Sequence, residues 1–180
     1  MYVQERLTEA LPGMKLIVPD DAGLAVLKGA VLVGHFPEKV TSRVMTHTYG
    51  IDIYRKFDPK THGNKRKVKV KSEWMLDNCF QIFVRANDEI SLDHKLSYAI
   101  MPLDSITTVP VYRSLYENPE YTTDPGCELL GTLKIRNSDK VSLSEQNVVV
   151  IFMFGQTELF IKVRHEPSGV EEILSLDCLQ

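Results

Sequence analysis

The sequence lacks the features of disulfide-rich, membrane-spanning or strongly charged proteins. Its 180 residues include only three cysteines, far apart and without a CxxC pair, which by themselves form neither a disulfide framework nor a zinc site. No apolar run reaches the roughly 18 residues that a membrane-spanning helix needs. The net charge of −3 gives no overall attraction to nucleic acid or to a membrane. These absences favour a reducing, intracellular compartment, and we expect a cytoplasmic protein.

Motifs of catalysis and of nucleotide binding are also missing. The histidines show no HExxH or His-x-His spacing, and no serine stands in a nucleophile elbow. There is no glycine-rich phosphate loop of the GxxxxGK[ST] type. The chain itself is therefore predicted not to be an enzyme, and we expect no metal and no other cofactor. The five histidines are His35, His47, His62, His94 and His165.

The clearest structural pattern lies in residues 147–176, which predict three consecutive strands. Val148–Phe154 is β-branched or aromatic throughout, as in a strand that is buried on both faces. Glu158–Arg164 alternates between apolar and polar residues, which is typical of a half-buried strand. The turn residues 166–169, with a proline and a glycine, lead into the third strand, Val170–Leu176.

Further short strands, with turn-forming residues between them, are predicted from residue 44 onward. This spacing is typical of an antiparallel β-sandwich, so we expect a mainly β fold for this part of the chain. The strand candidates are Thr46–Arg55, Phe80–Arg85, Lys95–Met101, Thr107–Leu115 and Glu128–Ile135.

Residues 1–35 differ from the rest, because they predict two helices and little β structure. The helices are Tyr2–Leu11 and Ala22–Gly34, and Lys15–Val18 is a brief strand-like run between them. A glycine inside a helix is costly, so Gly29 indicates close packing against another element. Two helices and one strand cannot enclose a core, so we expect them to be the end of a larger α/β domain.

A basic stretch at residues 65–71 is the strongest charge feature of the sequence. Such a stretch is compatible with nucleic-acid binding or nuclear localisation. Lysine and valine alternate from Lys67 to Lys71, however, which favours a strand with one solvated basic face. The valines could not stack on bases. A nucleic-acid site would require these lysines to form one surface with Arg55 and Lys56, and its affinity would fall steeply with salt.

Seven short motifs carry a resemblance to a known family. They are Val18–Gly34, Ser42–Val44, Thr48–Ile51, Asn118–Tyr121, Asp124–Gly131, Phe154–Leu159 and Ser168–Gly169. In this order they resemble the atypical 70 kDa heat-shock protein family, in particular its heat-shock 70 kDa protein 12 branch. The resemblance extends over almost the whole chain, and its first motif is similar to the last long helix of that family's actin-like nucleotide-binding domain.

This resemblance implies three parts of the chain. Residues 1–35 would be the C-terminal remnant of an actin-like nucleotide-binding domain, residues 36–46 a linker, and residues 47–180 a substrate-binding-like β-sandwich. The family's phosphate-binding and catalytic motifs have no counterpart here, so no ATPase activity of its own is implied. ATP would be expected only in a full-length parent protein.

The function that the resemblance implies is chaperone-like binding of extended hydrophobic peptide or client segments. By position, the candidate peptide-binding residues are Ile51, Tyr54, Tyr98 and Ile100. Unfolded or extended polypeptide clients and co-chaperones would be the partners, with no nucleic acid and no membrane. The alternative is a structural or protein–protein interaction module without a peptide cleft. The two alternatives differ in whether these four side chains converge on an open groove or on a closed core.

Overall fold

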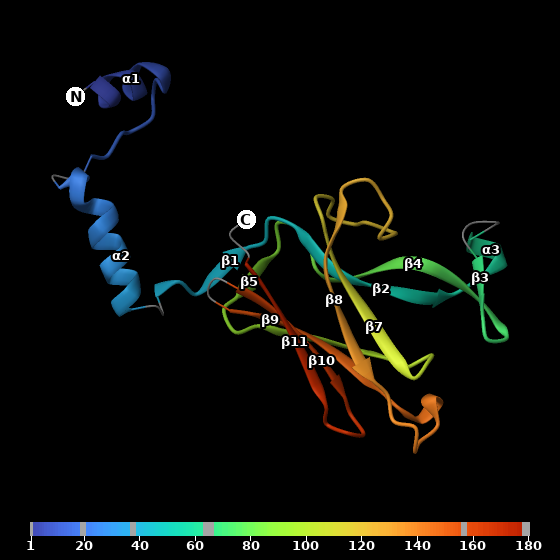
Figure 1. The fold of residues 1–180 in the computed structure, drawn as a ribbon. Helices are drawn as coiled ribbons and strands as arrows, with labels where there is room; N and C mark the ends of the chain where they lie inside the picture. The colour runs from blue at the N-terminus through green and yellow to red at the C-terminus, as the bar shows by residue number, and fades with distance from the viewer. Residues whose placement is uncertain (1, 19–20, 37–38, 63–66, 156–157, 178–180) are drawn as a thin grey trace. The chain divides into compact units, whose positions relative to one another are not determined.

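A computed structural model describes residues 2–18, 21–36, 39–62, 67–155 and 158–177 (Figure 1). The chain divides into two compact units, Met1–Thr41 and Ser42–Gln180, and each is described by itself. No helix of the described residues is long and apolar enough to cross a membrane.

The first unit contains the two predicted helices. They are α1 (Tyr2–Ala10) and α2 (Ala25–His35), and a 3₁₀ turn, η1 (Ala22–Leu24), leads into α2. The strand predicted at Lys15–Val18 is wrong. These four residues are exposed and pair with no described strand, so their local β pattern has no partner that could stabilise it.

Helix α2 buries none of its side chains within the described residues of this unit. The packing predicted for Gly29 is wrong, because no described atom of another element lies within 4 Å of the position that a Cβ would take there. Asp21 is the N-cap residue of the turn η1 but makes no capping hydrogen bond with its side chain, and its carboxylate instead accepts a hydrogen bond from Lys28 of α2. The apolar surface of α2 is therefore exposed.

The second unit is built mainly from antiparallel strands, as predicted. One sheet has the order β11–β10–β9–β6, so the meander predicted at residues 147–176 is confirmed. All three of its strand pairs are antiparallel. Their bounds are β6 (Lys95–Ile100), β9 (Val148–Phe154), β10 (Glu158–His165) and β11 (Glu171–Asp177).

A second antiparallel sheet has the order β3–β4–β2–β7–β8. Its strands are β2 (Thr48–Lys56), β3 (Lys67–Val70), β4 (Glu73–Val84), β7 (Ile106–Ser114) and β8 (Cys127–Arg136). Strand β4 begins seven residues before its predicted start. It continues through the polar pair Asp77 and Asn78, where Asn78 takes a φ of 54° and the pairing with β2 shifts register.

Small elements complete the unit. Strands β1 (Ser42–Val44) and β5 (Glu89–Ser91) form a two-stranded sheet that the sequence did not predict. A short helix, α3 (Pro59–His62), follows β2, and residues 63–66 lie outside the described residues. A 3₁₀ turn, η3 (Leu143–Glu145), precedes β9.

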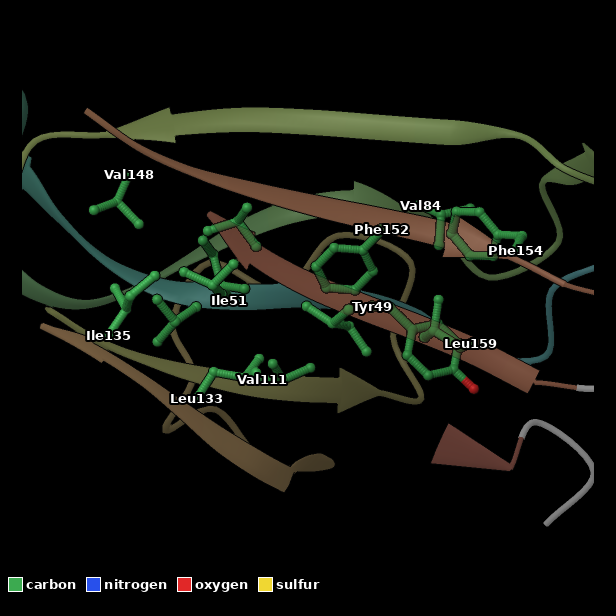
Figure 2. Close-up of a cluster of buried hydrophobic side chains, with 14 of the residues drawn as sticks. Tyr49, Ile51, Val84, Val111, Leu133, Ile135, Val148, Phe152, Phe154 and Leu159 are labelled. Atoms are coloured by element: carbon green, nitrogen blue, oxygen red, sulfur yellow. The ribbon is translucent and has the colours of Figure 1, made fainter. Parts of the chain in front are cut away.

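The two large sheets share one hydrophobic core (Figure 2). Val148, Val150, Phe152 and Phe154 of β9 are fully or almost fully buried, and the residues between them are half-buried. The prediction that both faces of this strand are buried is therefore only partly confirmed. Facing residues from the other sheet include Ile51 of β2 and Val111 of β7. Burying each such side chain contributes about 1.5–3 kcal/mol, which holds the sheets face to face.

A smaller cluster lies where β2 and β4 extend beyond this core. Leu76, Cys79 and Tyr121 are buried there, and Ile53 and Phe57 pack against them. The loop after β7 supplies Tyr121 and hydrogen-bonds to β4, since Phe80 N donates to Glu120 O at 3.0 Å and Thr122 N to Asn78 O at 2.8 Å. The loop therefore fixes the extension of β4.

Candidate peptide-binding surface

The four residues predicted to bind peptide lie on two strands of different sheets. Ile51 and Tyr54 belong to β2, and Tyr98 and Ile100 belong to β6. Ile51 is completely buried, and Ile100 packs half-buried against the same core cluster. Tyr54 and Tyr98 are exposed by 49% and 37%. The structure thus does not gather the four side chains in one open groove. Ile51 is a core residue, because it lies on the face of β2 that meets the other sheet.

Strand β6 forms the edge of its sheet. It pairs with β9 along Lys95–Ile100, and no described strand pairs with its other side. Alternate residues of an unpaired edge direct their backbone N–H and C=O groups outward, where another extended chain can pair with them. An unpaired strand edge of this kind is the first requirement for a surface that binds a peptide by strand pairing.

Tyr98 stands on this edge with aromatic support behind it. Its ring meets the ring of Phe83 of β4 edge to face, with centroids 6.4 Å apart. Phe83 in turn stacks on Phe152 in the core, at 4.1 Å and an interplanar angle of 25°. Leu96 and Ile100, two residues away on either side, pack half-buried against the core. Tyr98 is therefore an exposed aromatic side chain on a surface that the core keeps in place.

Apolar side chains continue beyond the end of β6. Met101, Leu103 and Ile106 are exposed, while Pro102 between the first two is buried and fixes the connection to β7. Sequence reasoning treated this connection as an ordinary turn. The signal that could have identified it was the presence of large apolar residues beside a proline in a segment that forms no strand.

The other flank of the two sheets is closed. Strands β8 and β11 approach each other there, and Leu174 lies against Gly131 so closely that a Cβ on Gly131 would be 2.8 Å from Leu174 Cδ2. Because the missing side chain of Gly131 provides the space that Leu174 fills, a peptide has no room between the sheets on this side.

Tyr54 lies on a different kind of surface. Strand β7 pairs with β2 only along Thr48–Ile51, and no described strand pairs with Asp52–Lys56 on that side. Arg55 Nη2 donates to Phe80 O at 2.9 Å, and Asp52 Oδ2 accepts from Thr122 Oγ1 at 2.9 Å. This half of β2 is polar, and the structure does not place Tyr54 and Tyr98 in one continuous apolar groove.

Burial makes the ionised form of Asp52 less favourable. Desolvation is the main cause that raises the pKa of this carboxyl, the hydrogen bond from Thr122 lowers it, and the nearby charge of Asp77 raises it further. Burial likewise raises the pKa of the Cys79 thiol. Within the described parts of the chain, no three His, Cys, Asp or Glu side chains are arranged to hold a metal ion.

The fold and this surface define a mainly β, antiparallel domain with one open apolar edge. No family model matches the chain. It is 30% identical over 152 residues to heat shock 70 kDa protein 12A of Homo sapiens and to that of Mus musculus, which covers 81% of this chain and 22% of each relative. It is 32% identical over 127 residues to heat shock 70 kDa protein 12B of Homo sapiens, covering 68% of this chain and 18% of that protein.

These similarities confirm the resemblance that the motifs predicted. The chain is a relative of the atypical 70 kDa heat-shock proteins of the protein 12 branch. It spans about a fifth of the length of the curated relatives it matches.

Proposed function

We propose that the second unit is a substrate-binding-like β-sandwich that binds extended hydrophobic polypeptide segments in a chaperone-like manner. The observation that carries this proposal is the β6 edge, which combines a side that pairs with no described strand, the exposed ring of Tyr98 and its support by Phe83. A peptide would pair with the backbone of β6 and place alternate apolar side chains against Tyr98 and the half-buried Leu96 and Ile100.

The relatives support this proposal only at the level of the family. These relatives carry the names of heat-shock proteins, and this chain spans about a fifth of the length of each. The proposal includes the expectation that the chain has no ATPase activity of its own and requires no cofactor. Unfolded or extended clients, together with co-chaperones, are the proposed partners, and neither nucleic acid nor membrane is required.

One observation favours the alternative of a structural or protein–protein interaction module. Ile51 is completely buried, so the pair of strands β2 and β6 encloses core instead of a cleft at that position. A module of this kind would bind a folded partner or none, and would not distinguish extended peptides by their hydrophobicity.

Fluorescence anisotropy with labelled peptides tests the proposal. The peptides are rich in leucine and flanked by basic residues, and the purified chain is compared with a Tyr98→Asp variant. We expect saturable binding by the parent chain and a loss of about tenfold or more in affinity for the variant, since the charge would lie in the apolar contact.

Two matched variants serve as controls. Ile173→Asp adds the same charge at an exposed position of β11, the opposite edge of the same sheet, and should bind peptide as the parent does. Tyr54→Asp tests the other predicted tyrosine and should have a small effect. A folded parent chain that binds none of the peptides would favour the structural module.

A further inference from the structure

A second edge strand, β3, differs from β6 in charge. The described residues from Arg55 to Lys71 include six Lys or Arg residues and one acidic residue, Asp58, although the whole chain has a net charge of −3. Lys56, Lys60, Lys69 and Lys71 are exposed and form no ion pair with a described residue. Of the basic stretch seen in the sequence, Lys65 and Arg66 lie outside the described residues. The described remainder of this segment is thus rich in positive charge, although the protein as a whole is acidic.

Strand β3 confirms the alternation that the sequence predicted. Lys67 and Lys69 are exposed, whereas Val68 and Val70 are half-buried on the opposite face. The strand pairs with β4 on one side only, and no described strand pairs with its outer edge. The outer edge therefore has free backbone groups, with lysines on one face and aliphatic side chains on the other.

Aromatic side chains hold this edge in place. Lys67 Nζ lies 5.3 Å from the centroid of the Trp74 ring and 5.6 Å from that of Phe57. Phe57 packs against the smaller buried cluster, and its backbone N–H donates to Trp74 O at 3.1 Å. Trp74 lies opposite Lys69 in the strand register and is 51% exposed. The two cation–π contacts thus place Lys67 at a defined position beside the free edge.

We propose that the outer edge of β3 binds an acidic extended segment of a partner protein, in which carboxylate and aliphatic side chains alternate. Paired with β3, such a segment places its carboxylates directly across from Lys67 and Lys69 and its aliphatic side chains beside Val68 and Val70. Pairing with β3 of a second copy is disfavoured, because it would bring lysines against lysines.

A protein segment fits this surface better than nucleic acid does. Free backbone N–H and C=O groups along a strand recognise another strand, and single-stranded nucleic acid offers no matching ladder. Lys67 already lies over the rings of Trp74 and Phe57, so these ring faces are not open for bases to stack on. The inference is independent of the peptide site at β6, since it concerns a different sheet and a peptide of opposite charge.

Trp74 is the single tryptophan of the chain, so its fluorescence reports directly on this edge. We would titrate the full chain with an eight-residue peptide of alternating glutamate and valine, and with a matched peptide that has glutamine in place of glutamate. We expect a saturable change in tryptophan fluorescence with the glutamate peptide and about tenfold weaker binding of the glutamine peptide. Equal affinity for both peptides would overturn the proposal.

A charge swap makes the test specific for these lysines. In the double variant Lys67→Glu, Lys69→Glu the glutamate peptide should bind about tenfold or more weakly, and a lysine–valine peptide should bind instead. On the parent chain, methylation of alternate backbone amides of the glutamate peptide should abolish binding; retained binding would contradict strand pairing, whether or not the double variant folds. Tighter binding of oligothymidine than of the glutamate peptide would assign the surface to nucleic acid and overturn the proposal.

Discussion

The two large sheets have two flanks, and the flanks differ in how closely the sheets approach each other there. At the closed flank, Leu174 of β11 fills the space beside Gly131 of β8, and the sheets are in direct contact. At the other flank, β6 ends its sheet with Tyr98 exposed, and the ring of Tyr98 contacts Phe83, which stacks on Phe152 in the core. The comparison shows that one core can seal one flank with aliphatic packing and leave the other accessible to an added strand.

The largest expected effect comes from removing the aromatic support of the open flank. Phe152→Ala should lower the free energy of unfolding by about 3–5 kcal/mol, because it leaves a cavity in the core and removes the stacking partner of Phe83. Urea denaturation followed by circular dichroism measures this loss. Phe83→Ala, at a half-buried position, is the matched comparison and should cost less. An equal loss for both variants would contradict the distinction between core and edge.

A buried polar network around Gln146 and His165 gives the next largest effect. Gln146 Nε2 donates to the carbonyl oxygens of Ser138 and Val141, so both of its N–H groups are used. Its Oε1 must therefore accept from His165 Nε2 at 2.6 Å, which places a proton on that nitrogen, and His165 Nδ1 forms a second hydrogen bond with Ser168 Oγ. The network joins the loop before β9 to the end of β10.

The variant Gln146→Leu keeps the volume of this side chain and removes all four of its hydrogen bonds. We expect a loss of about 2 kcal/mol or more in the free energy of unfolding, since several buried groups lose their partner. Urea denaturation measures it, with Gln4→Leu on the exposed helix α1 as the control. A stability equal to that of the parent would show that the network contributes nothing.

A smaller effect is expected at the closed flank. Gly131→Ala should cost about 1 kcal/mol, because the atom that the new methyl group meets is the mobile end of Leu174. Thermal unfolding measures the change, and a double-mutant cycle with Leu174→Ala should show that the two changes are not additive. Full additivity would mean that the two residues are not in contact.

The smallest effect concerns pH. Because burial raises the pKa of Asp52 in the folded chain above its unfolded value, the folded state holds more protons in the interval between the two values. Stability contributed by this group is therefore present below the unfolded pKa and is lost as the pH rises through the folded pKa. The Asp52→Asn variant, whose side-chain oxygen still accepts from Thr122, should have a larger free energy of unfolding than the parent chain at neutral pH. Under acid conditions the two free energies of unfolding should be equal. Urea denaturation at several pH values measures the difference, and a gain that persists in acid would contradict the assignment.

Local patterns predicted the strands whose stability comes from regular burial. The alternation of Glu158–Arg164 and the apolar run of β9 correspond to core strands, and the helices at residues 2–11 and 22–34 also form. Lys15–Val18 has a similar local pattern, but no described strand pairs with it, and it forms no strand. Sequence alone could not distinguish these cases, because a strand requires a partner that only the fold supplies.

The candidate site shows the same limit at the level of single residues. Motif position suggested Ile51 and Tyr54 equally, yet Ile51 lies in the buried first half of β2 and Tyr54 in its exposed second half. The contact of Tyr98 with Phe83 joins strands of different sheets, so no spacing in the sequence could reveal it. The basic face of β3, by contrast, could be predicted from the alternation of lysine and valine alone.

Backbone hydrogen exchange, measured with and without a saturating leucine-rich peptide, tests peptide binding at the open flank most directly. We predict that the amides of Lys95–Met101 exchange more slowly when the peptide is bound, while those of β11 at the other edge are unchanged, because new backbone hydrogen bonds form only at β6. Saturable peptide binding without any added protection in β6 would contradict the proposed site.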